Sequence, residues 1–335
     1  MSGIPVPFSD IAKPANDLLN KDFYHTTAAN LEVKSKAPNG VVFNVKGKSA
    51  HDGPISGSVS TTISRSNFRI SHINGSGKIE GKYTDKATGN PHHPTLAAIA
   101  WTLESSLISQ PMLTWSYLGL ALTQTWTTSN SLDTKLELED NLTKGLKAEV
   151  LSNYLPANST YGGKFNLLYK QPNIHTRLFT DLFKGPTATF DVTLGHEGFL
   201  IGAEGGYDVG KAAITKYALA AGYSQGSYAA AVTATNNLTI FSASYYHKVN
   251  AEVEAGAKAT WDSTAGSNVG LEVATKYKLD PSSFAKAKIN DRGIAALAYN
   301  VKLGTGVTLG LGASLDTQNL NQAAHKVGAS FTFEG

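Results

Sequence analysis

Lysine side chains recur at alternate positions of short β-like runs, and they are the groups in this sequence best placed for chemistry. Lys286 and Lys288, for example, alternate with the apolar residues Ala287 and Ile289. Such a run has one apolar face and one face that tolerates charge. A lysine that faces water attracts phosphates and other anions as a point charge. We therefore predict electrostatic attraction of anions by the lysines of these faces, which are Lys34, Lys46, Lys48, Lys258, Lys276, Lys286, Lys288 and Lys326.

Acidic residues share those faces, and they limit the strength of the predicted attraction. Glu32, Glu252, Glu254 and Glu272 occupy positions of the same alternation, while the whole chain carries a net charge of only +3. If these faces line a pore, rings of lysine favour anions. Mixed signs with a basic excess therefore predict a weak anion preference, and the same balance would also suit an ordinary, slightly basic protein.

Catalytic motifs are absent from the sequence. It contains no Walker loop, no GxGxxG after a strand, no GxSxG elbow and no HExxH, because Gly198 follows His196 and Glu197. The chain has no cysteine, which excludes disulfides and thiolate ligands, and His92 and His93 are the only adjacent histidines. We predict no enzyme activity, no metal and no cofactor. A Ser/His/Asp arrangement formed by folding stays open at this point.

The first 24 residues differ from the rest of the chain. Apolar residues such as Phe8, Ile11 and Leu18 recur at helical spacing, so we predict an amphipathic helix over 1–24. Ser9 is a plausible N-cap, and Pro14 would split the helix or move its start. The segment lacks the basic start and apolar core of a secretory signal, so we expect insertion from the cytosol. Two further lysines would add to a pore field if this helix lines the pore, namely Lys13 and Lys21.

Two alternating runs lie between Ala29 and His51, and from Thr123 to the end alternating runs of about 9–11 residues follow one another, with Asn, Asp, Gly and Pro between them. Val253 to Trp261 and Val307 to Leu315 are examples. Only 16% of the residues are charged, yet the mean hydropathy is −0.17, as expected when apolar residues are spread by alternation. Many such runs without an intervening helix predict an all-β, closed transmembrane barrel over 25–335, because closure removes open strand edges in lipid.

The hairpin from Tyr277 to Tyr299, around the turn at Asn290 to Gly293, closely resembles the signature segment of mitochondrial outer-membrane porins, the voltage-dependent anion channels. The matching positions are Tyr277, Asp280, Pro281, Ser283, Ala287, Lys288, Ile289, Asn290, Asp291, Ala296, Leu297 and Tyr299. The N-terminal run PFSDIAKPANDLLNKDFY resembles the helix that these porins carry inside the barrel. The likeness is to fungal-type members and covers residues 5–52, 77–90 and 120–335.

This resemblance implies a barrel of about 19 strands with an N-terminal α-helix in or near the pore. It also implies a voltage-gated, weakly anion-selective channel of the mitochondrial outer membrane that passes small metabolites, including ATP and ADP, and ions. The implied surroundings are membrane lipids, the mitochondrial barrel-insertion machinery and, as a possibility, further copies of the chain in a homo-oligomer. No nucleic-acid partner is implied.

The resemblance implies roles for two motifs. Gly145, Leu146 and Lys147 match a motif proposed to contact nucleotides, although a turn followed by an ordinary lumen lysine explains them equally well. The last strand resembles the sorting signal read by the insertion machinery, in which a polar residue and a glycine precede two aromatic residues. The residues concerned are Lys326, Gly328, Phe331 and Phe333.

Two segments, 58–76 and 91–119, have no counterpart in the resembling family. The first is rich in Ser, Thr and Asn, and the second contains Pro91, Pro94 and Pro111 with little alternation. Residues 95–122 carry one charge and could be read as a marginal membrane helix, but Pro111 would break it. We expect both segments to be extra sequence, looped outside the membrane; a binding insert is the alternative.

Two other classes of protein compete with the channel interpretation. A translocase barrel of the same membrane would share the architecture and import proteins through an acidic lumen. A soluble β-rich binding protein would show the same alternation with one face in water. The basic excess and the hairpin around Asn290 favour the channel, and dependence on detergent would separate the soluble class.

Overall fold

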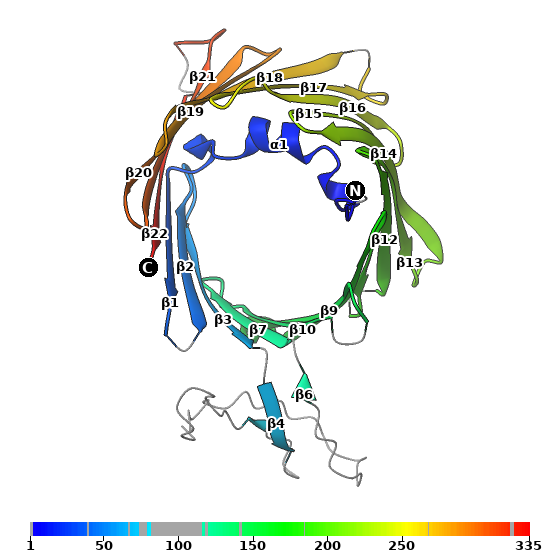
Figure 1. Cartoon of the computed structure of the whole chain (residues 1–335). Helices are drawn as coiled ribbons and strands as arrows, with labels where there is room; N and C mark the ends of the chain where they lie inside the picture. The colour runs from blue at the N-terminus through cyan, green and yellow to red at the C-terminus, as the bar shows by residue number, and fades with distance from the viewer. Residues whose placement is uncertain are drawn as a thin grey trace.

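The computed structural model describes residues 3–38, 40–65, 68–73, 79–81, 116–117, 120–140, 143–183, 185–266, 268–321 and 325–335. Nineteen strands form one closed barrel (Figure 1). They are β1 (Ala29–Lys36), β2 (Val41–Ser49), β3 (Ile55–Arg65), β7 (Leu120–Thr127), β8 (Leu132–Glu139), β9 (Leu146–Leu155), β10 (Thr160–Gln171), β11 (Ile174–Asp181), β12 (Thr187–His196), β13 (Phe199–Asp208), β14 (Ala213–Gln225), β15 (Tyr228–Thr235), β16 (Ile240–Lys248), β17 (Val253–Asp262), β18 (Val269–Asp280), β19 (Ser283–Asn290), β20 (Ile294–Gly304), β21 (Val307–Asp316) and β22 (Lys326–Glu334). This architecture confirms the predicted fold class.

Neighbouring strands along the chain pair antiparallel, and one parallel pair closes the barrel. That pair joins β1 to β22, from Ala29 opposite Ala329 to Lys34 opposite Glu334. An odd number of strands requires such a parallel seam, since the first and last strands then run in the same direction. Closure leaves no strand edge of the barrel unpaired, which is what a sheet in lipid requires.

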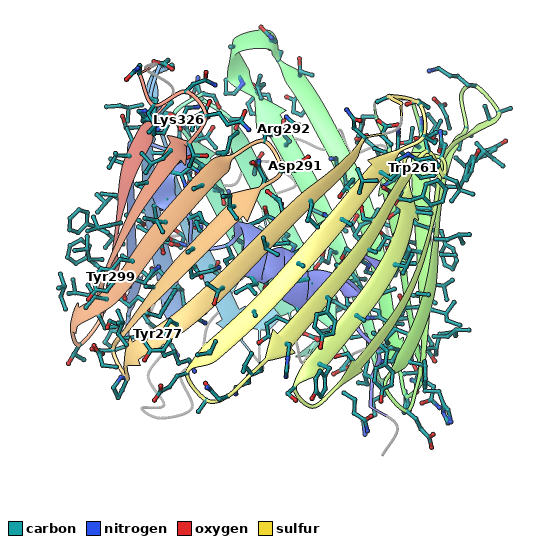
Figure 2. All side chains as sticks on the ribbon, turned by 90° about the horizontal axis from the view of Figure 1, so that it is seen from above. Trp261, Tyr277, Asp291, Arg292, Tyr299 and Lys326 are labelled. Carbon is teal, nitrogen blue, oxygen red and sulfur yellow. The ribbon has the colours of Figure 1, made fainter. Side chains whose placement is uncertain are left out.

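The outer face of the barrel is apolar. Exposed side chains on the outside include Leu31 and Val33 of β1 and Phe331 and Phe333 of β22, and they follow the alternation of each strand. Figure 2 shows Tyr277 and Tyr299 towards one rim of the wall and Trp261 towards the other. An apolar band with aromatic residues at both rims is typical of barrels that span a membrane. No helix among the described residues is long and apolar enough to cross a membrane.

The N-terminal segment (residues 3–28) lies inside the ring of strands (Figure 1). It forms the 3-10 turn η1 (Phe8–Asp10), the helix α1 (Lys13–Asn20) and the 3-10 turn η2 (Tyr24–Thr26). Pro14 occupies the first turn of α1, where a missing N–H costs nothing, so it moves the helix start to Lys13. The prediction of Ser9 as N-cap was wrong, because Ser9 lies in η1 and Ala12 precedes α1.

The apolar stripe of the N-terminal segment packs against small residues of the wall. Phe8 and Ile11 contact alanines of β14 and β15, including Ala218. Leu18 and Leu19 pack on Ala274 of β18, and Leu19 is fully buried. Burial of such side chains stabilises the docked helix by about 1.5–3 kcal/mol each. The helix is therefore part of the inner wall.

The predicted extra segments agree only in part with the structure. Residues 58–65 were expected in a loop but belong to β3, which pairs with β2 and β7. Serines and threonines of this strand face the aqueous interior, while Val59 faces out. Because segments rich in Ser and Thr are typical of loops, the sequence alone predicted a loop here. A separate small sheet contains β4 (Phe68–Ile73), β5 (Ile79–Gly81) and β6 (Ser116–Tyr117). The segment 91–119 lies otherwise outside the described residues.

Candidate functional site

The inner face of the wall is identified by the side chains that touch the N-terminal segment. Lys258 Nζ donates a hydrogen bond to Asn16 Oδ1 at 3.2 Å, and Lys286 Nζ donates to the backbone carbonyl of Asp17 at 3.1 Å. Cross-strand partners share one face of a sheet. The register therefore places Lys276, which is opposite Lys286, on the inner face, together with Lys288 two residues further along β19.

The lysines of β1 and β2 also face the lumen. Gly328 of β22 lies against the backbone of the N-terminal segment, so Ser330, two residues further on, faces inwards too. Asn30 of β1 donates to Ser330 Oγ at 3.2 Å, which assigns the even-numbered positions of β1 to the inside. The pairing of β1 with β2 then brings Lys34, Lys46 and Lys48 to the lumen.

Several of these lysines are paired with carboxylates. Glu32 lies 3.2 Å from Lys46 Nζ and 3.8 Å from Lys34 Nζ, and Lys34 also contacts Glu334 at 3.0 Å. Lys276 lies 3.6 Å from Glu254, and Lys288 lies 3.7 Å from Glu272. The opposite charges of such a pair largely cancel, so the pair contributes little to the electrostatic field in the lumen. The acidic residues therefore reduce the contribution of these four lysines to anion attraction.

Other lumen lysines keep an uncompensated charge. Within the described part of the chain, no carboxylate lies within 4.0 Å of Lys48, Lys258 or Lys326. Lys326 opens β22 and is opposite Ser314 on the inner face, and Figure 2 places it at one rim of the barrel. These three lysines, together with Lys21 at the end of α1, are therefore available to anions.

Lys286 differs from the other lumen lysines because the N-terminal segment covers it. Its side chain is only 2% exposed. The ammonium donates to the carbonyls of Asp17 at 3.1 Å and Lys21 at 2.6 Å, and it lies 4.9 Å from the centre of the Phe23 ring. A cation at the C-terminal end of a helix interacts favourably with the last carbonyls, and here it adds to the Lys21 N–H that already donates to the Asp17 carbonyl at 3.0 Å. The geometry makes Lys286 a tether for α1.

A second set of contacts holds the start of the N-terminal segment. His175 Nδ1 lies 3.1 Å from the carbonyl oxygen of Pro5, and Arg177 binds the fully buried carboxylate of Asp191 at 2.8 Å. Arg177 also donates to Ser9 Oγ at 3.3 Å. Sequence reasoning missed these residues, because each is an isolated polar residue in an alternating strand. The segment is thus fastened to the wall at both of its ends.

Lys13 on α1 is exposed and belongs to a local pair. Its ammonium donates to Asp10 Oδ2 at 2.9 Å. That hydrogen bond, followed by the charge of Asp10, raises the pKa of Lys13 above its usual value. Lys13 thus stays charged inside the pore, with a neighbouring carboxylate that offsets much of its field.

The motif Gly145, Leu146 and Lys147 lies at the hairpin between β8 and β9. Gly145 has a backbone φ of +86°, which residues other than glycine rarely adopt, and its N–H donates to Asp140 Oδ1 at 2.7 Å. Lys147 lies 2.7 Å from Glu137 and 3.0 Å from Glu149. Both of those carboxylates also contact Lys135, at 2.8 and 3.2 Å. This balanced network disfavours Lys147 as a free phosphate contact, and the turn accounts for the glycine.

The residues of the predicted sorting signal divide between the two faces of β22. Phe331 and Phe333 point outwards to the apolar belt, whereas Lys326 and Gly328 face the lumen. The alternation of polar and aromatic positions is therefore what any last strand of this barrel needs. A role in sorting stays a prediction.

The pKa of His25 in η2 makes the stability of the barrel depend on pH. Its pKa is lowered from the usual 6.5, first by partial burial and then by the positive charges of Lys288, Lys326 and His51. Above about pH 6.5 both the folded and the unfolded chain hold a neutral ring. Below it the unfolded chain binds a proton that the folded chain binds less readily, so the free energy of unfolding falls until the lower folded pKa is reached.

We therefore expect the thermal midpoint in detergent to fall more between about pH 8 and about pH 5 in the unmodified protein than in His25→Gln. Glutamine keeps a polar side chain of similar length and does not titrate in this range. Equal losses in the two proteins would contradict the assignment of the effect to His25.

Comparison with known proteins shows a likeness along nearly the whole chain. The family model described as eukaryotic porin matches residues 4–107 and 100–328. A mitochondrial outer membrane protein porin from Neurospora crassa is 56% identical over 327 residues, covering 98% of each chain. Non-selective voltage-gated ion channel 1 of Saccharomyces cerevisiae is 37% identical over 98% of this chain and 99% of its own. The relative VDAC1 of Rattus norvegicus, also named a non-selective voltage-gated ion channel, is 29% identical over 99% of both.

Proposed function

Because this chain belongs to the eukaryotic porin family, we propose that it is a voltage-gated channel of the mitochondrial outer membrane that passes small ions and metabolites. The observation that carries the proposal is the closed barrel itself. Its outer face is apolar, and its inner face presents charged and polar side chains around a lumen that also contains α1 (Figure 1). Such a wall provides a water-filled path through a bilayer.

The open channel has a weak preference for anions in this proposal. Lys48, Lys258 and Lys326 supply uncompensated positive charge, whereas Lys34, Lys46, Lys276 and Lys288 have carboxylates within 4.0 Å. A small basic excess attracts anions without excluding cations. The relative from Saccharomyces cerevisiae is named a non-selective channel. A weak preference that lets both signs pass is compatible with that name.

Nucleotides such as ATP and ADP are proposed to pass transiently and not to occupy a tight site. The phosphates would be attracted by the unpaired lysines, with Lys21 on α1 adding to the field. Lys147 is a poorer candidate, since Glu137 and Glu149 already surround its charge. Membrane lipids cover the outer face, and contacts with the insertion machinery and with further copies of the chain are proposals that follow from the family.

The two alternatives are less well supported. A protein-importing barrel calls for an acidic lumen, whereas the uncompensated groups identified in this lumen are lysines. A soluble binding protein does not expose an apolar belt with side chains such as Phe331 and Leu297 all round its outside. Membership of the porin family favours a channel over an enzyme as well.

Recording from the purified chain in planar bilayers tests the proposal. We expect stable open channels whose conductance falls when a sufficient voltage of either sign is applied. Detergent without protein, added in the same amount, is the control. Absence of channels from protein that is folded by circular dichroism, or channels that never close with voltage, would contradict the proposal.

A further inference from the structure

Three glycines on the inner face of β21 and β22 form a socket for the chain just before β1. The glycine socket consists of Gly310, Gly312 and Gly328, and Gly312 pairs directly with Gly328. A Cβ atom on Gly312 would lie 2.7 Å from the backbone nitrogens of Tyr24 and His25. One on Gly328 would overlap the carbonyl oxygens of Tyr24 and Thr27, and one on Gly310 would overlap the Tyr24 ring. The backbone of residues 24–27 therefore fits only where these side chains are absent.

The socket lies at the beginning of the parallel seam. Ala29 is the first residue of β1 to pair with β22, and Ala329 N–H donates to the carbonyl of Ala28 at 3.1 Å. Further inside the barrel, the Tyr24 hydroxyl donates to Asn300 Oδ1 of β20 at 2.7 Å. Residues 24–27 thus cross the inner surface of the last strands immediately before the chain enters the wall.

The seam lacks the features that set the register elsewhere in the barrel. Short hairpin loops fix the pairing of most antiparallel neighbours, whereas no loop joins β1 to β22. The alternation of faces does not fix the register of β1 against β22 either, because a slip of two residues keeps apolar side chains outside and polar ones inside. Two side-chain contacts cross the seam, from Asn30 to Ser330 and from Lys34 to Glu334, but the second is largely exposed and contributes little. The six residue pairs of this parallel arrangement therefore need a further contact to select them.

We propose that residues 24–27 act as a register pin, which fixes the pairing of β1 with β22 by docking in the glycine socket. A slip of two residues along β22 would bring Lys326 or Ser330 under the carbonyls of Tyr24 and Thr27, where a Cβ atom does not fit. Only the native register places Gly328 at that point. Gly328 accordingly has a structural role in the folded barrel that is separate from any sorting signal.

Disulfide trapping reads the register directly, because the natural chain has no cysteine. The pair Asn30→Cys with Ser330→Cys joins residues that are opposite each other in the native seam. The pairs Asn30→Cys with Thr332→Cys and Glu32→Cys with Ser330→Cys become opposite only after slips of two residues in opposite directions. Disulfides form when the Cα atoms lie within about 7 Å, so directly opposed residues are strongly favoured over diagonal ones.

Each cysteine pair is placed in the full chain with the natural glycines, with Gly312→Ala, with Gly328→Ala, or with Gly270→Ala. Gly270 is the matched control, since it faces the lumen from β18 and its Cβ would meet nothing closer than 3.8 Å. Gly312 lies outside the predicted sorting segment. All chains are refolded into detergent, where no insertion machinery is present.

We expect the native cross-link alone in the natural and Gly270→Ala backgrounds. In Gly312→Ala and Gly328→Ala it should fall by about half or more, with a slipped cross-link appearing and a thermal midpoint lower by about 5 °C. If all three glycine variants keep only the native cross-link, the proposal is overturned. Should Gly312→Ala and Gly328→Ala fail to refold, Thr27→Pro with all natural glycines decides. Proline fixes φ at about −65° where Thr27 has φ −134°, and it removes the N–H that binds the Tyr24 carbonyl, so the backbone of residues 24–27 leaves the socket. Slipped cross-links then support the pin, and native cross-links alone overturn it.

Discussion

Replacing Lys286 by methionine should release the C-terminal end of α1 from the wall. The substitution keeps the length of the side chain but removes the donor to the carbonyls of Asp17 and Lys21. Loss of a hydrogen bond from a charged donor costs about 1.5–3 kcal/mol. With a central value of about 2 kcal/mol, local opening of α1 becomes about 30-fold more frequent.

Hydrogen exchange of the α1 amides in detergent measures this opening, and bilayer recordings of the same protein should show a noisier open state. Lys288→Met is the matched control, from the same strand and face. Its side chain is 19% exposed, and its ammonium lies 3.7 Å from Glu272 and 5.1 Å from the centre of the Phe23 ring, beyond the end of α1. Its loss should therefore change the free energy of α1 opening by less than about 1 kcal/mol. Equal effects of Lys286→Met and Lys288→Met on α1 would show that Lys286 is not a tether.

Reversing three unpaired lumen lysines should remove the anion preference of the open channel. The variant Lys48→Glu, Lys258→Glu, Lys326→Glu exchanges three uncompensated positive charges for three negative ones. The paired lysines remain neutralised by their carboxylates. Because selectivity in a wide pore follows the net charge of its wall, we expect the reversal potential under a salt gradient to move to the cation side.

The control for this experiment replaces three paired lysines by neutral residues in the variant Lys46→Gln, Lys276→Gln, Lys288→Gln. It lowers the wall charge by half as much and also frees Glu32, Glu254 and Glu272. A smaller shift in the same direction is expected. If the unpaired set produces no shift, or less than the paired set, the assignment of selectivity to Lys48, Lys258 and Lys326 is wrong.

The alternation of residue types predicted most of the barrel, because a strand between lipid and water must alternate with period two. It placed lysines such as Lys46 and Lys276 on one face before any pairing was known. It was misleading for residues 58–65, where Ser and Thr facing the lumen resemble a loop. The predicted start of the helix, with Ser9 as N-cap, was also wrong. The helix α1 begins at Lys13, because Pro14 is suited to the first turn and Ala12 precedes it without a capping hydroxyl.

The contacts that fasten the N-terminal segment were beyond sequence reasoning. Lys286 and the carbonyl of Asp17 are 269 residues apart along the chain, and a carbonyl acceptor has no sequence signal. Gly312 appears in sequence as an ordinary strand glycine and Gly328 as part of the predicted sorting signal, and only the path of residues 24–27 shows that both contact the same backbone. The pairing of Lys147 with Glu137 likewise needs the cross-strand register. Sequence gives the faces of the strands, whereas tertiary structure decides which charges stay uncompensated.

The reversal potential of the unmodified channel in a planar bilayer, measured between two salt concentrations at low voltage, tests the central claim most directly. A lumen of mixed sign with a small excess of unpaired lysines predicts a modest potential on the anion side. That potential should shrink as salt is raised, because surface charge is screened over about 8–10 Å at moderate ionic strength. A potential of zero or on the cation side at low salt would contradict the account of the pore given by these residues.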